Sequence, residues 1–108
     1  MIKPTEEEKK LIDEIEVKVC KYFNTDCQSI ISNDKRANTS MTRGFIFYIL
    51  HVDYRISISK IANTYLRTPR TIFWHVNKVR HLLKLRIYKD MYDKICNIIK
   101  SCYTSIRE

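Results

Sequence analysis

The residues best suited to chemistry in this chain lie in the segment TPRTIFWHVNKVRHLL, residues 68–83. Thr68 suits a helix cap and Pro69 suits the first helical position, so the segment predicts a helix that begins with Arg70 close to its N-terminus. Such an N-terminus presents unbonded backbone N–H groups and the positive end of the helix dipole. An arginine there is able to donate two hydrogen bonds to a guanine. The segment therefore indicates recognition of a nucleic acid.

Helical spacing predicts which side of this segment faces outward. An apolar stripe marks the inner face and consists of Ile72, Val76, Val79 and Leu83. The residues predicted to face out or partly out are Arg70, Thr71, Trp74, His75 and Lys78. Thr71 suits a phosphate or a thymine methyl group. Trp74 has two interpretations: a contact to DNA or a partner protein, or the edge of the core against residues 40–53.

The preceding segment ISISKIANTYL, residues 56–66, predicts a helix that Ser57 caps. Two helices joined by a short turn, the second of them basic, are typical of a helix-turn-helix, which we place at residues 57–86. Ala62 is small enough for the two helices to approach closely, and Ile72 packs the second helix back on the first. Leu66 occupies the turn position usually given to glycine, where a positive φ costs about 1 kcal/mol.

The rest of the chain predicts helices that support this unit. We expect an N-terminal helix within residues 1–24, a short helix capped by Thr25, a polar loop at residues 32–40, an apolar helix at residues 41–53 and a last helix at residues 88–104. Gly44 permits close approach of another helix or of a ligand. With one Gly and two Pro in 108 residues, the sequence predicts a single all-α domain of five to six helices, residues 1–108.

Charge is unevenly distributed along the chain, whose net charge is +8. Residues 1–16 hold six acids and three lysines, a net charge of −3, whereas residues 35–89 hold twelve bases and one acid, Asp53. A basic centre of this size is typical of a protein that binds a polyanion, although a well-solvated surface is the alternative.

Several classes of function find no support in the residues. The cysteines at positions 20, 27, 96 and 102 lack C-x-x-C spacing and do not cluster with the histidines, so we expect buried small hydrophobic residues or free thiols, a reducing cytoplasm and no metal. The N-terminus is acidic and the longest uncharged run is short, so we expect no signal peptide and no membrane span. No nucleophile–base pair or carboxylate pair stands out, so we expect no enzyme activity and no cofactor.

The order of these segments resembles the C-terminal DNA-binding domain of the bacterial replication initiator DnaA, which has a fold similar to Trp repressor. The resemblance runs from about residue 11 to residue 103 and includes VKVCKYFNTDCQSIISNDKR, MTRGFIFYIL and ISISKIANTY. The segment TPRTIFWHVNKV falls where that family carries its Asp-His-Thr-Thr-Val signature. Thr71 matches the second Thr and Ile72 the Val, but Thr68, Pro69 and Arg70 replace the first three residues, and Trp74 replaces a further His. The DNA sequence that is read should therefore differ from the initiator's own.

The resemblance implies that residues 33–43 lie against the DNA backbone or the adjacent minor groove, with Arg36 and Arg43 as the main contacts. The full set of expected DNA-binding residues is Lys35, Arg36, Ser40, Thr42, Arg43, Ser59, Thr68, Pro69, Arg70, Thr71, Trp74, His75 and Lys78. A phosphate loop of the form Gly-x-x-x-x-Gly-Lys is impossible with Gly44 alone, so the chain binds no nucleotide cofactor through such a loop.

The sequence thus predicts a monomeric protein of the bacterial cytosol or nucleoid that binds double-stranded DNA in a sequence-specific manner. Its role would be replication initiation, copy control or transcription regulation, with a replication or transcription protein as a further possible partner. The alternative is a protein–protein interaction module with a degenerate helix-turn-helix, in which Tyr65, Phe73 and Trp74 form an apolar patch.

Overall fold

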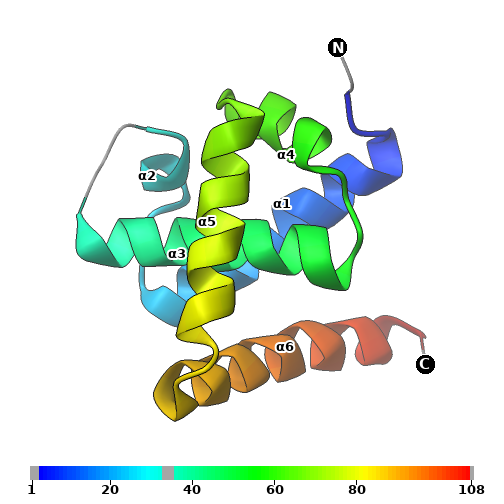
Figure 1. Cartoon of the computed structure of the whole chain (residues 1–108). Coiled ribbons are helices and arrows are strands. Elements are labelled where there is room, and N and C mark those ends of the chain that lie inside the picture. The colour runs from blue at the N-terminus through cyan, green and yellow to red at the C-terminus, as the bar shows by residue number, and fades with distance from the viewer. Residues whose placement is uncertain (1–2, 33–35, 108) are drawn as a thin grey trace.

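The computed structural model describes the backbone of residues 3–32 and 36–107, and the side chains of residues 3–32 and 36–100. Within these ranges the chain forms six α-helices, one π-helical turn and no strand (Figure 1). In chain order the elements are α1 (Glu6–Phe23), α2 (Cys27–Ile31), α3 (Ala37–Tyr48), η1 (Ile49–Asp53), α4 (Ile58–Tyr65), α5 (Pro69–Leu82) and α6 (Arg86–Arg107). The prediction of an all-α fold is confirmed.

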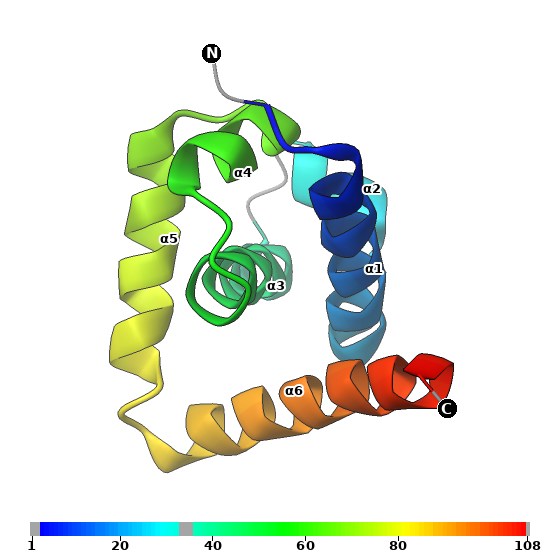
Figure 2. The same cartoon turned by 90° about the vertical axis from the view of Figure 1, so that its right-hand side faces the viewer.

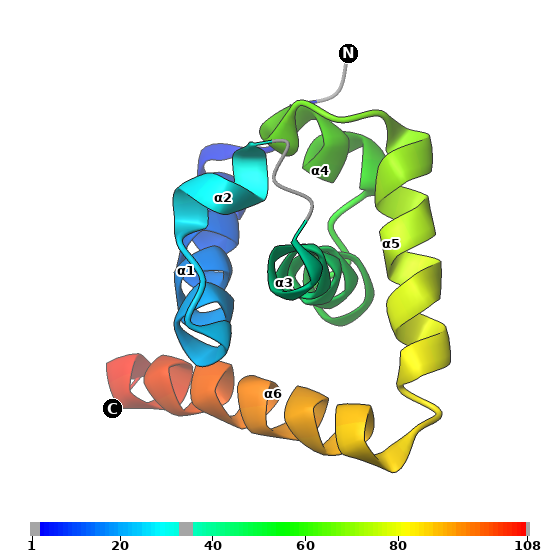
Figure 3. The ribbon, with the colours of Figure 1, turned by 90° about the vertical axis from the view of Figure 1, so that its left-hand side faces the viewer.

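The apolar helix α3 lies at the centre, and the other helices surround it. Seen end-on in Figures 2 and 3, α3 has α5 on one side, α1 and α2 on the other, and α4 and α6 across the remaining two sides. The side chains of Phe45, Phe47, Ile49 and Leu50 are completely buried. The second half of α3 and the turn that follows it are largely buried because their residues are apolar on nearly every side.

Local hydrogen bonds fix where the helices begin. Thr5 and Glu8 form a reciprocal capping box at α1, in which the Glu8 N–H donates to Thr5 Oγ1 at 3.1 Å and the Thr5 N–H donates to Glu8 Oε1 at 2.9 Å. Asp26 caps α2 in place of the predicted Thr25, whose hydroxyl instead lies 3.2 Å from the Thr42 hydroxyl. The Ser57 side chain accepts from the Lys60 N–H and so caps α4 as predicted.

The central segment departs from the prediction at both of its ends. Helix α3 begins at Ala37, inside the predicted polar loop, although the side chain of Arg36 at its N-cap position makes no capping hydrogen bond. At the other end the helix widens into η1, which lies at residues 49–53. This turn brings Asp53 beside α6, where the Tyr92 hydroxyl donates to Asp53 Oδ1 at 2.6 Å. Helix α6 packs through Ile95 and Ile99, while Ile98 is 42% exposed.

Helix α5 crosses α3 at Gly44, the only glycine in the sequence (Figure 1). A Cβ atom at this position would lie 3.0 Å from Val79 Cγ2 and 3.7 Å from His75 Nδ1. Gly44 therefore permits close approach between two helices, the first of the two roles that the sequence offered for it.

We predict that Gly44→Ala destabilises the fold despite the better helix propensity of alanine. The new methyl group would overlap Val79, whose branched side chain is buried and has one preferred rotamer in a helix. Overpacking of this kind costs about 1–3 kcal/mol, and the gain in helix propensity of about 1 kcal/mol offsets part of it. The free energy of unfolding, measured by chemical denaturation, should therefore fall.

The matched control repeats the same substitution in a Val79→Ala background, where the clash is absent. There, Gly44→Ala should be neutral or stabilising, because only the propensity term remains. An equal loss of stability in both backgrounds would show that the contact with Val79 is not the cause.

Candidate nucleic-acid interface

Helices α4 and α5 form a compact pair joined by a short turn. Ala62 and Ile72 are buried between them, and Leu66 adopts a left-handed conformation with φ 55°, as its place in the turn predicted. The Arg67 N–H donates to the Ala62 carbonyl at 3.0 Å, which closes the end of α4. The Leu66 side chain is 84% exposed, so its own burial does not compensate for the cost of the left-handed backbone conformation.

The N-terminus of α5 is preorganised by its own side chains. Thr68 accepts a hydrogen bond from the Thr71 N–H at 3.3 Å, and the two hydroxyls lie 2.9 Å apart. Pro69 occupies the first helical turn, and Thr68, Pro69 and Arg70 are all exposed. The start of α5 therefore offers an exposed arginine, Arg70, directly after its cap.

The outer face of α5 is basic and aromatic, and the helix contains no acidic residue. Its exposed residues are Pro69, Arg70, Phe73, Trp74, Lys78, Arg80 and His81. The side chain of Trp74 is 54% exposed, so the interpretation that places it at the edge of the core is wrong. The ammonium group of Lys78 lies 5.0 Å from the centre of the Trp74 ring, a cation–π geometry that orients both side chains on the outer face.

Helix α3 packs against α5, and Ala37 and Ser40 in its first turns share a cavity with Lys78 of α5. Arg36 immediately precedes α3 and is exposed, and Ser40 lies in the first turns and is half-buried. Between the two helices lies a cavity of about 300 Å³, which we call the α3–α5 cavity. It is lined by Ala37, Ser40, Met41, Gly44, His75, Lys78, Val79 and Leu82.

Two residues predicted to contact DNA, Thr42 and Arg43, are buried instead. Because α3 begins at Ala37, both fall in its second turn and face the core side of the helix. The Arg43 guanidinium donates to the carbonyls of Ser29 and Ile30 at 3.0 Å each. Thr42 donates to the Asn38 carbonyl at 2.8 Å. Neither side chain is placed to contact a ligand at the surface, and their role is structural.

His75, predicted to face outward, is also buried, with 6% of its surface exposed. Its ring packs edge-on against those of Phe47 and Trp74, with centroids 5.4 and 5.0 Å away. Burial, reinforced by the positive charges of Arg43, Arg67 and Lys78, lowers the pKa of His75 to about 4. The imidazole is therefore neutral near pH 7.

A residue that the sequence did not single out, Arg67, joins the turn to α2. Its guanidinium donates to the carbonyls of Ile30 at 3.0 Å and Ser32 at 2.8 Å. Arg43 reaches the same two carbonyls from α3, so two cations cap the C-terminal end of α2. These partners lie more than 30 positions from Arg67 in the sequence, and no local pattern indicates such a contact.

The remaining predicted contacts lie at three places. Ser59 is exposed in the first turn of α4, and Thr71 is half-buried at the start of α5. Lys35 lies outside the described residues. The structure thus brings Ser40 and Lys78 together at the α3–α5 cavity and leaves Arg70 and Trp74 exposed on α5, whereas Arg36 lines a separate hollow with Asp26 and Ser29. It removes Thr42, Arg43 and His75 from the outer surface.

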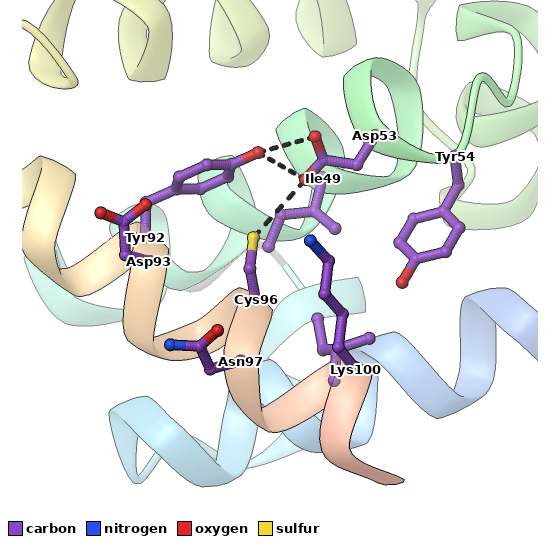
Figure 4. A pocket seen from close by; sticks show the side chains of 9 residues that line it. Ile49, Asp53, Tyr54, Tyr92, Asp93, Cys96, Asn97 and Lys100 are labelled. Atoms are coloured by element: carbon purple, nitrogen blue, oxygen red, sulfur yellow. Dashed lines mark hydrogen bonds between the residues drawn. The ribbon is translucent and has the colours of Figure 1, made fainter. Parts of the chain in front are cut away.

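A larger cavity, of about 560 Å³, lies between η1 and α6, away from this face (Figure 4). Tyr92 and Cys96 both donate to the Asp53 carboxylate, and Lys100 lines the same cavity. Burial raises the pKa of Cys96 to about 11, with the Asp53 charge adding to the shift, so the thiol stays protonated near pH 7. The cluster joins α6 to the end of the central helix and offers no activated nucleophile.

Other sites and the comparisons add few constraints. In the part of the chain that the structure describes, no group of three His, Cys, Asp or Glu side chains is arranged to hold a metal ion. No helix in that part is both long enough and apolar enough to span a membrane. Comparison with models of known protein families finds no match to the chain, and comparison with curated protein sequences finds none either.

We predict that Arg43→Met destabilises the fold by about 2–3 kcal/mol, because it removes charge-assisted hydrogen bonds to buried carbonyls. Arg43→Lys keeps the charge but lacks the planar fork, so it should lose an intermediate amount. Chemical denaturation gives both values. Arg70→Met, which removes an exposed guanidinium, is the control and should stay near wild type. Equal free energies of unfolding for Arg43→Met and wild type would contradict the structural role of this arginine.

We also predict that acid destabilises the protein through His75. In the unfolded chain the imidazole has its ordinary pKa of 6.5, whereas in the folded chain the value is about 4. Between these values the unfolded state binds a proton that the folded state excludes, so the free energy of unfolding falls as the pH falls from 6.5 to 4. The slope from this group approaches about 1.4 kcal/mol per pH unit.

Denaturation of wild type and His75→Gln at several pH values checks this dependence. Between pH 6.5 and 4, the free energy of unfolding of His75→Gln should depend less steeply on pH than that of wild type, by the contribution of one bound proton. His81→Gln, an exposed change on the same helix, should keep the wild-type dependence. Parallel curves for wild type and His75→Gln would contradict the assignment.

Proposed function

We propose that this protein binds duplex DNA, with α5 in the major groove and the N-terminal end of α3 against the flanking backbone. The observation that carries the proposal is the α3–α5 crossing, which places Ser40 of α3 and Lys78 of α5 in one cavity beside the acid-free outer face of α5. A helix with its side chains is about 10–12 Å wide, close to the width of the major groove.

The outward residues of α5 have chemistry that suits base and backbone contacts. Arg70 projects from the first turn and suits a bidentate contact to guanine. Trp74, one turn further along, offers an apolar surface to a thymine methyl group, and Lys78, a further turn along, offers a charge to a phosphate. These three residues lie at four-residue spacing and therefore share one side of the helix.

The arrangement of charge favours the same orientation. The acidic first turn of α1, with Glu6, Glu7 and Glu8, belongs to a helix on the opposite side of α3 from α5 (Figure 2). A polyanion is therefore attracted to the α5 side and repelled from the far side, which orients the protein as it approaches DNA.

Within this proposal the chain is a diverged, stand-alone counterpart of the DnaA DNA-binding domain, which its sequence resembles. It would act as a monomer in the cytosol or nucleoid, in replication initiation, copy control or transcription regulation. Because Thr68, Pro69, Arg70 and Trp74 replace the residues of the family signature, we expect a different DNA site.

A second candidate function, docking of a partner protein, is favoured by the exposed apolar side chains on and near α5. Phe73 and Trp74 are 52% and 54% exposed, and Leu66 at the turn is 84% exposed. Tyr65, which was predicted to belong to this patch, is buried, with 1% of its surface exposed. Exposed aromatic residues are common at protein interfaces. The basic residues that accompany them, without any acid on α5, make DNA the better-supported partner.

Selection from a random duplex pool at about 150 mM salt distinguishes the two functions, because non-specific contacts are already weak there. One enriched motif is the expected result and would identify the site. If no motif is enriched and the retained DNA is released as salt increases, the basic face binds polyanions in general, and the partner-protein function becomes the better explanation.

We predict different effects from two arginines once the site is known. Arg70→Ala should cost about 1–3 kcal/mol on the selected duplex and relax the preference at one base pair, because it removes a base contact. Arg36→Ala should weaken binding to selected and random duplexes alike and reduce the salt slope by about one unit. Fluorescence anisotropy titrations at several salt concentrations measure both.

Lys21→Ala is the matched control, since Lys21 is an exposed base in the last turn of α1, on the far side of α3. It should leave binding close to wild type. If all three variants have the same effect on both duplexes, the assignment of α5 to the groove is wrong.

A further inference from the structure

We infer that the α3–α5 cavity is a phosphate site, in which the His75 imidazole and the Lys78 ammonium hold one phosphodiester of the bound DNA. The inference rests on the proposed function and adds a residue that is hidden from the outer face. Ser40, from the other wall, completes the polar lining.

The cavity has suitable size and composition for such a group. Its volume of about 300 Å³ is roughly ten times the volume of a water molecule in the liquid. Among the described residues its polar lining consists of Ser40, His75 and Lys78, and none of the lining residues is acidic. A negatively charged ligand would therefore meet donors from both helices.

His75 is the unusual member of this lining. Only 6% of its surface is exposed, and no hydrogen bond to its ring is present within the described residues. The Nδ1 atom would lie 3.7 Å from a Cβ at Gly44, which also lines the cavity. The polar edge of the ring therefore lies where a bound phosphate oxygen would accept its N–H.

The charges around His75 favour an anion at this place. The groups that act on it are Arg43 from α3, Arg67 from the α4–α5 turn and Lys78 from α5, and all three are positive. Together with burial they keep the imidazole neutral, so it serves as a hydrogen-bond donor without adding a further buried charge. A phosphodiester bound here would offset their effect and raise the pKa of His75 toward its ordinary value.

The position of the cavity connects this site with the outer face of α5. The Lys78 ammonium lies 5.0 Å from the Trp74 ring and also lines the cavity, so it borders both surfaces. A phosphate held between α3 and α5 would fix the depth and register of α5 in the groove. His75 is thus a positioning residue for the contacts made by Arg70 and Trp74.

The first test follows the His75 ring nitrogens by NMR as the pH is changed, for the full chain alone, with inorganic phosphate, and with a duplex that it binds. We expect the selected duplex to raise the pKa of His75 by at least one unit, and phosphate at high concentration to raise it less. No change with a bound duplex would overturn the site. A shift with inorganic phosphate in a protein that binds no duplex would support an anion site and refute the DNA function.

The second test replaces each phosphate of the duplex in turn by a neutral methylphosphonate. For wild type, replacement of one particular phosphate should weaken binding about tenfold more than replacement of the neighbouring phosphates, as expected for a charge-assisted contact. His75→Phe preserves the aromatic packing and removes the donor, so the extra cost at that position should largely disappear. Ser40→Ala, a milder change on the opposite wall, should reduce the same cost. Identical profiles for wild type and both variants would refute the proposal.

Discussion

The close approach of α5 to α3 at Gly44 is the constraint on which the rest of this structure depends. With hydrogen as its side chain, Gly44 leaves room for Val79, and any Cβ there would meet Val79 Cγ2 at 3.0 Å. This separation fixes where the outer face of α5 lies relative to the N-terminal end of α3. It also sets the dimensions of the cavity between the two helices and the burial of His75 within it. A wider crossing would separate the two halves of the candidate interface.

The second constraint is the pair of arginines at the C-terminal end of α2. A helix of five residues has little stability of its own, and its last carbonyls have no partners within the helix. Arg43 from α3 and Arg67 from the turn both donate to the carbonyls of Ile30 and Ser32. Helix α2 is thereby connected to both the central helix and the helix pair. The same two arginines contribute to the low pKa of His75, so the residues that hold α2 in place also affect the protonation of a residue that lines the cavity.

Features that depend on local chemistry were predictable from the sequence. The capping box at Thr5, the caps at Ser57 and Thr68, and the left-handed turn at Leu66 all follow from residue types at fixed spacing. Burial of the stretch from Phe45 to Leu50 follows from its continuous apolar character. In each case the neighbours along the chain supply the decisive interactions.

Features that depend on distant contacts were not predictable. The polar composition of residues 37–40 favours a loop, but packing against the rest of the fold makes them helical, and this change places Arg43 inside. His75 was predicted to face out or partly out, but it borders the apolar stripe, three positions after Ile72 and four before Val79, and is buried with it. The burial becomes possible because Phe47 and Trp74 enclose the ring and Gly44 leaves space beside it.

The fate of the basic residues shows why a count of charges overstates a binding surface. Of the twelve bases at residues 35–89, Arg43 and Arg67 bind backbone carbonyls, and Lys60 pairs with Glu8 at 2.9 Å. These three still contribute to the positive potential that attracts a polyanion from a distance. In the proposed complex they would not meet phosphates directly, so they would release few of the counterions condensed on DNA. Long-range attraction would therefore reflect the whole basic centre, whereas the salt dependence of the bound state would reflect only the exposed bases that border α5 and the start of α3.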